Sequence, residues 1–134
     1  MSQPKQNPAT QLLAAWIEHF NAHDLDAICS LYSTEAVLWG TYAANLTTEA
    51  EGVRRYFSEA FRQGLRAEVV QDTLHTQSYE SICVCSGAYV VTKQSSSGSA
   101  EYPARFSLVV STVQGQWRIV HHHSSLNPVR TSGA

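Results

Sequence analysis

The stretch Trp117-Arg118-Ile119-Val120-His121-His122-His123-Ser124-Ser125 decides the fold class. Its aromatic and β-branched residues alternate with polar ones, which is typical of a β-strand with two distinct faces. The same period of two runs upstream, so we predict four long strands near residues 65–76, 79–93, 100–112 and 116–125. The links between these strands are short, which favours antiparallel hairpins.

Helical spacing replaces the period of two in the first half of the chain. Apolar residues recur every three or four positions over residues 10–22 and predict the first helix. Asp24 is expected to cap a short second helix. The run Thr48-Glu49-Ala50-Glu51 fits a capping box that opens a third helix, and Gly64 suits the left-handed residue that ends it.

The order of these elements predicts an α+β fold. A short strand over 36–39, after a turn at 33–35, separates the second helix from the third. The helices should cover one face of a strongly curved, mostly antiparallel sheet, and a second copy of the chain should cover the other face. We expect one domain over residues 10–126, with a flexible lead at 1–9 and a flexible tail at 127–134.

Composition excludes several classes of protein. The 134 residues are 43% hydrophobic and 15% charged, so the chain is not intrinsically disordered. A net charge of −2 gives no basic footprint for nucleic acid, and no apolar run is long enough for a membrane span. The N-terminal residues lack a secretory signal, and the three cysteines form no C-x-x-C pair. We therefore expect a cytoplasmic protein with reduced cysteines that contacts neither nucleic acid nor membrane.

His121 and His123 are the first candidates for a functional role. Strict alternation along the strand places them about 6–7 Å apart on one face, beside Trp117 and Ile119. Such a pair of imidazoles can form structural hydrogen bonds, bind a polar or anionic ligand, transfer a proton or bind a metal. A metal site needs a third ligand, and no suitable partner is evident, so we predict neither a metal nor another cofactor.

Arg105 is the second candidate, in the strand that precedes the histidines. An arginine inside a barrel needs an anionic partner, because a lone buried charge is very costly. An external carboxylate held by two hydrogen bonds would supply that partner. The alternative is a solvent-facing arginine on an edge strand, since Pro103 lies nearby.

Aromatic side chains supply the walls of the expected pocket. Trp39 and Tyr89 either pack in the core or line a cavity, and the Tyr89 hydroxyl would be a polar handle in the second case. Nucleophilic catalysis is poorly supported because the chain has no G-x-S-x-G elbow. It also has no dinucleotide-binding fingerprint.

Three stretches resemble the nuclear transport factor 2-like superfamily. Within it, the chain is most similar to the association-domain group of calcium/calmodulin-dependent protein kinase II and its stand-alone bacterial relatives. The stretches are Phe20-Asn21-Ala22-His23-Asp24, Glu51-Gly52, and Gly115-Gln116-Trp117-Arg118-Ile119-Val120-His121-His122-His123-Ser124. The last one resembles that group's G-x-W-x-x-V-H-x-H-x-S ending.

This resemblance implies a cone of six curved strands around a pocket, with dimers or larger rings formed through the outer sheet face. Arg105 occupies the position of a pocket-facing arginine in that group, and His121 and His123 match its two motif histidines. Tyr56 falls near a position where the group has a pocket-facing histidine. The superfamily includes steroid isomerases, dehydratases, polyketide cyclases and epoxide hydrolases.

The sequence thus predicts a protein that binds a small organic ligand, with a carboxylate as one candidate. His121 and His123 would supply hydrogen bonds or acid–base chemistry, and Arg105 would supply charge. The remaining predicted contacts are Trp39, Tyr56, Tyr89 and Trp117. The alternative is a non-catalytic oligomerisation module with a vestigial pocket, and whether the protein is an enzyme stays open.

Overall fold

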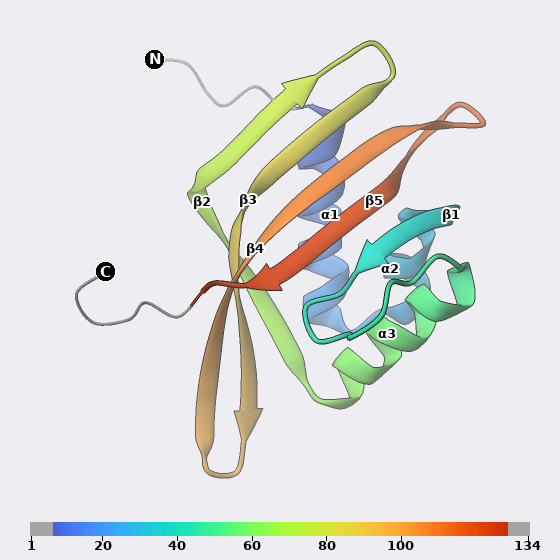
Figure 1. Ribbon diagram of the computed structural model, residues 1–134. Helices are drawn as coiled ribbons and strands as arrows, with labels where there is room; N and C mark the ends of the chain where they lie inside the picture. The colour runs from blue at the N-terminus through green and yellow to red at the C-terminus, as the bar shows by residue number, and fades with distance from the viewer. Residues whose placement is uncertain (1–6, 129–134) are drawn as a thin grey trace.

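The computed structural model describes residues 7–128 and places three helices on one side of a five-stranded sheet (Figure 1). This arrangement confirms the predicted α+β fold. The elements are α1 (Pro8–Ala22), α2 (Leu25–Ser30), β1 (Tyr32–Trp39), α3 (Ala50–Arg62), β2 (Leu65–Ser78), β3 (Ile82–Ser95), β4 (Gly98–Val113) and β5 (Gln116–Leu126). Residues 1–6 of the predicted flexible lead and residues 129–134 of the predicted flexible tail lie outside the described range.

The strands lie in the order β1-β5-β4-β3-β2. All neighbours are antiparallel except β1 and β5, which are parallel. The sheet has five strands and not the six that the resemblance implied. Beyond β1 there is one isolated antiparallel bridge, between Leu38 and Thr47, which is too short to count as a strand.

The ends of the helices show which local signals act as expected. The Asp24 side chain accepts the Ala27 N–H at 3.2 Å and caps α2. Gly64 has a φ of 72°, which confirms the left-handed residue after α3. The capping box at Thr48 is wrong, because α3 starts after Glu49 and its N-cap makes no side-chain hydrogen bond. Backbone pairing of Thr47 with Leu38 holds this segment extended just before the helix.

The predicted turn at 33–35 is also wrong, because β1 already begins at Tyr32. Tyr32 lies opposite Ile119 of β5, and its ring is buried in the core. Polar residues follow it because β1 is an edge strand, where side chains on the solvent side need not be apolar.

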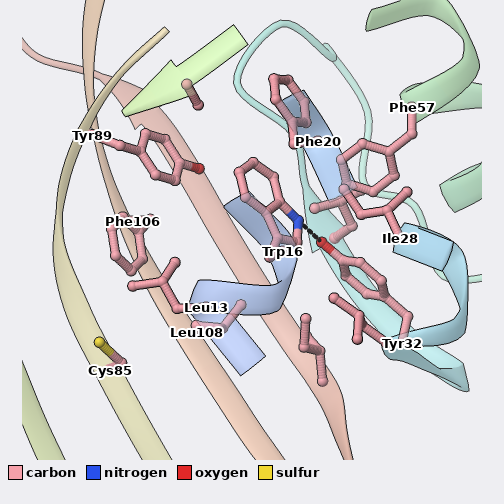
Figure 2. Packing of buried hydrophobic residues seen from close by; sticks show 14 of the residues in the cluster. Leu13, Trp16, Phe20, Ile28, Tyr32, Phe57, Cys85, Tyr89, Phe106 and Leu108 are labelled. Atoms are coloured by element: carbon pink, nitrogen blue, oxygen red, sulfur yellow. Dashed lines mark hydrogen bonds between the residues drawn. The ribbon is translucent and has the colours of Figure 1, made fainter. Parts of the chain in front are cut away.

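The core lies between α1 and the sheet face that the helices cover. Trp16 of α1 stacks on Phe20 with ring centroids 4.7 Å apart and on Tyr89 of β3 at 5.6 Å. Tyr89 stacks in turn on Phe106 of β4 at 4.7 Å (Figure 2). These stacked rings join helix and sheet into one packed layer.

A β-bulge in β5 decides which of its side chains face this core. Val109 of β4 pairs with His121, but the next residue, Val110, pairs with Ile119. Val120 is therefore an extra residue on β5. The insertion reverses the alternation of faces, so that Ile119 and His122 both point to the helices and are buried.

Two further expectations concern cysteines and membrane spans. Cys83 and Cys85 are buried and Cys29 is half-buried, and all three are free thiols, as predicted. Within residues 7–128, no helix has the length and apolar character needed to cross a membrane.

Candidate functional site

His122 lies at the centre of a buried group of polar side chains. Its imidazole is only 3% exposed and packs against the rings of Trp16 and Phe106. Nδ1 lies 2.8 Å from the Tyr32 hydroxyl, and Nε2 lies 3.4 Å from the Tyr89 hydroxyl. Both nitrogens thus have hydroxyl partners, although the second contact is long for a hydrogen bond.

The polar group extends in both directions from His122. On one side, Trp16 Nε1 donates to the Tyr32 hydroxyl at 3.0 Å, the hydrogen bond drawn in Figure 2. On the other side, the Tyr89 hydroxyl donates to Ser124 Oγ at 2.7 Å. Ser124 Oγ shares a short hydrogen bond with Thr41 Oγ1. The chain of contacts therefore links α1, β1, β5 and β3 to the segment that follows β1.

Thr41 fastens this segment to α3 as well. Its backbone N–H donates to the Tyr56 hydroxyl at 2.9 Å. Gly40 is required here, because a Cβ at this position would lie 2.2 Å from the Tyr56 ring. The close approach of Gly40 lets Tyr56 reach Thr41.

A small cavity of about 20 Å³ lies beside these groups, which is room for roughly one water molecule. Its polar wall is formed by five side chains, those of Thr41, Tyr56, Tyr89, His122 and Ser124. The rest of the lining is mostly apolar and consists of Trp16, Phe20, Leu38, Gly40, Tyr42, Phe57, Ala60, Leu65 and Val91. Among residues 7–128, no Asp, Glu, Lys or Arg belongs to this lining.

The polar groups of the cavity are uncharged at neutral pH. Burial lowers the pKa of His122 from 6.5 to about 3, with smaller contributions from the neighbouring charges of His121 and His123. Burial also raises the pKa of Tyr32, Tyr56 and Tyr89. The site can donate and accept hydrogen bonds, but it cannot neutralise a charge.

Comparison with known proteins assigns this fold to a family. Residues 9–129 match the profile of the SnoaL-like domain. The chain belongs to the SnoaL-like family. Among curated proteins we found no match to it.

Solved structures share the fold of this SnoaL-like protein at low sequence identity. A "putative calcium/calmodulin dependent protein kinase II association domain" from Xanthomonas campestris is 20% identical, with a TM-score of 0.83 over 96% of this chain and 94% of that one. A ketosteroid isomerase-like protein from Erwinia carotovora atroseptica is 13% identical, with a TM-score of 0.71 over 90% and 95%. A "putative dehydratase from the NTF2-like family" from Streptomyces avermitilis is 10% identical, with a TM-score of 0.78 over 90% and 94%. These matches confirm the resemblance in fold.

The predicted inward orientation of His121 and His123 is wrong in this SnoaL-like protein. Both lie on the sheet face away from the helices, with His121 half-buried and His123 exposed. The bulge at Val120 is the reason, because one extra residue moves every later side chain to the opposite face. The same shift brings in His122 and Ser124, which sequence reasoning missed.

Arg105 also lies on the outer face, so its predicted inward orientation is wrong. It sits between buried Ala104 and Phe106, is itself exposed, and donates from Nε to Ser125 Oγ at 3.3 Å. Alternation along a regular strand gives this result directly, because Phe106 must face the core. Arg105 is thus solvent-facing, as the alternative had it, but β4 is not an edge strand, because it pairs with both β3 and β5.

The other predicted contacts divide between the two faces. Tyr56 and Tyr89 line the inner cavity. Trp39 is 38% exposed on the outer face, where its ring lies 6.3 Å from that of His123. Trp117 packs against the core but does not line the cavity. The predicted residues therefore form two groups and not one site.

Proposed function

We propose that this SnoaL-like protein binds a small, uncharged organic molecule in the cavity beside His122. The observation that carries the proposal is the convergence of five polar side chains on one otherwise apolar cavity. These side chains come from α3, β3, β5 and the segment after β1. A mostly apolar hollow with a few convergent polar groups is the usual composition of a ligand site.

The ligand should be neutral because the lining offers no counter-charge. A carboxylate in this cavity would lose its hydration with no cation to replace it, and that cost is large. Arg105, the cation expected from the sequence, lies on the opposite face of the sheet. We therefore propose a neutral ligand in place of the carboxylate that the sequence suggested.

Entry of a ligand requires the segment after β1 to move. The cavity as described holds about one water molecule, so a larger guest must displace the residues at its mouth. Thr41 holds this segment to Tyr56 and Ser124, while Tyr42 and Leu46 farther along are exposed. Release of the Thr41 contacts would open the cavity without disturbing the packed rings beneath it.

The chemistry available to a bound ligand is polarisation by neutral donors. A neutral imidazole and a phenol can stabilise negative charge that develops on a carbonyl oxygen. Isomerisation, dehydration and cyclisation all build up such charge, and two relatives carry the names of an isomerase-like protein and a dehydratase.

A pair of matched variants tests the location of the site. In titration calorimetry, His122→Phe should weaken cyclohexanone binding by about tenfold or more, because one hydrogen bond to the ligand is lost. His123→Phe makes the same change one residue away on the outer face and should leave the affinity unaltered. Tyr56→Phe provides a second inner variant if His122→Phe does not fold.

Two results would count against the inner site. The first is equal weakening by His123→Phe, which would place the ligand on the outer face. The second is preferential binding of cyclohexanecarboxylate that Arg105→Ala abolishes, which would restore the anion site expected from the sequence.

A second function, self-association, is favoured by the outer sheet face. Among residues 7–128, no helix covers this face (Figure 1). It carries apolar side chains that are exposed or half-buried: Val37, Trp39, Val70, Ile82, Val84, Val90 and Val109. We propose that a second copy of the chain packs on it, as the name of the Xanthomonas relative suggests for that protein.

The molar mass in solution tests this second proposal. Light scattering should give at least twice the chain mass of 14.8 kDa. Val84→Arg should return the protein to a monomer, because the new charge lies in the middle of the apolar face. A wild-type protein that stays monomeric at every concentration would refute self-association and leave the inner site unaffected.

A further inference from the structure

The hydrogen bonds around Tyr32 have a fixed direction, set by Trp16. An indole N–H can only donate, so the Tyr32 oxygen accepts from Trp16 at 3.0 Å. The proton of the Tyr32 hydroxyl must then go elsewhere. Among the described residues, its other hydrogen-bonding partner is His122 Nδ1 at 2.8 Å.

This direction selects one tautomer of His122. If Tyr32 donates to Nδ1, that nitrogen carries no proton, and the proton of the neutral ring is on Nε2. In the opposite tautomer, Nδ1–H and Trp16 would both donate to Tyr32. The buried Tyr32 hydroxyl would then have no acceptor, and an unsatisfied buried donor costs about 1–3 kcal/mol.

The Nε2–H group is the least satisfied donor in the chain of contacts. It lies 3.4 Å from the Tyr89 oxygen, whose own proton is already donated to Ser124 at 2.7 Å. Tyr56 is similar, because its oxygen accepts the Thr41 N–H and its own O–H is left to donate. His122 and Tyr56 both belong to the cavity lining, so the cavity offers two donors.

We propose that Trp16 is a positioning residue that holds His122 in the Nε2–H tautomer through Tyr32, so that the cavity selects a ligand with a hydrogen-bond acceptor such as a ketone oxygen. This inference rests on the proposed inner site and names its ligand class. Besides packing in the core, Trp16 acts on the ligand indirectly. Its indole N–H fixes the direction of the Tyr32 hydroxyl, and that hydroxyl fixes the tautomer of His122. A ligand oxygen with two lone pairs can accept from both cavity donors.

Nitrogen-15 NMR of the imidazole tests the tautomer without any ligand. Protonated and unprotonated ring nitrogens have well-separated shifts. Wild-type His122 should show an unprotonated Nδ1 and a protonated Nε2. Trp16→Phe keeps an aromatic ring but removes the donor, so Tyr32 can then accept from Nδ1–H and a mixture of tautomers should appear. A wild-type His122 protonated on Nδ1, or an unchanged tautomer in Trp16→Phe, would overturn the inference.

A packing control separates positioning from general loosening. Phe106→Leu removes a ring that contacts His122 and Tyr89, but it leaves every hydrogen bond in the chain of contacts. Its His122 should keep the Nε2–H tautomer. A tautomer change in Phe106→Leu equal to that in Trp16→Phe would contradict a specific role for Trp16. If Trp16→Phe does not fold, Tyr32→Phe takes its place, because it removes the donor to Nδ1 directly.

A ligand titration separates this inference from the proposed function. Cyclohexanone should bind Trp16→Phe about twofold more weakly than wild type, because affinity falls with the fraction of His122 that still presents its donor, which is about half in an even mixture of tautomers. If His122 has the predicted tautomer but cyclohexanone does not bind, the ligand site and the acceptor preference are refuted. The positioning role of Trp16 would still stand. Binding in the inner cavity with His122 protonated on Nδ1 would refute the positioning role alone.

Discussion

Truncation of Trp16 to alanine should lower the free energy of unfolding by about 3–5 kcal/mol. The side chain is 4% exposed and stacks between Phe20 and Tyr89. Its removal leaves a cavity in the packed layer and takes away the donor to Tyr32. Urea denaturation followed by circular dichroism measures the change.

Trp39→Ala is the matched control, because it deletes the same side chain on the outer face. Trp39 is 38% exposed, so in the monomeric Val84→Arg background its loss should cost much less, on the order of 1 kcal/mol or below. If Trp39→Ala is as damaging as Trp16→Ala, the assignment of the two tryptophans to inner and outer faces is wrong.

Acidification should destabilise the protein through His122 between about pH 6.5 and pH 3. The pKa of His122 is about 3 in the folded chain and about 6.5 when the ring is exposed. Between these values the unfolded chain holds a proton that the folded chain does not. Stability therefore falls as the pH falls, by about 1.4 kcal/mol for each pH unit from this group, and the contribution is complete above pH 6.5.

The groups around His122 explain why its pKa is lowered and why stability falls in acid. Trp16, Tyr32, Tyr89 and Phe106 pack around the ring, and none of them can carry the negative charge that would stabilise an imidazolium near neutral pH. The neighbouring His121 and His123 lower the pKa further when they are protonated.

A variant isolates this contribution from that of the carboxylates, which titrate in the same range. Stability measured against pH should be flatter for His122→Phe than for wild type by about 1.4 kcal/mol per unit. Parallel curves for wild type and His122→Phe would mean that His122 does not have a lowered pKa.

Local patterns in the sequence predicted most of the elements. The period of two found the four long strands, and Asp24 and Gly64 marked helix ends correctly, because their effects act within a few residues. Thr48 failed as a cap because a distant contact, the pairing of Thr47 with Leu38, decides where α3 starts. Signals of short range were reliable except where tertiary contacts opposed them.

The candidate site was only partly predictable, and the bulge in β5 is the main reason. Three consecutive histidines can face either side, and one extra residue at Val120 decides between the two arrangements. Val120 has no local signature of a bulge, since β-branched residues are common in regular strands. Tyr89 was a candidate for the cavity wall because it is a large aromatic residue with a polar hydroxyl, whereas Tyr56 was a candidate through the family resemblance. Thr41 and Ser124 join the site only through contacts between distant segments.

The most direct test of the inner site uses the indole N–H signals of the three tryptophans, Trp16, Trp39 and Trp117. Cyclohexanone is added to the nitrogen-15-labelled protein while two-dimensional spectra are recorded. The Trp16 signal should shift with the ligand, since its indole lines the cavity and donates to Tyr32, while the Trp39 signal stays in place. A shift of Trp39 alone, or no shift of Trp16 at millimolar cyclohexanone, would contradict binding beside His122.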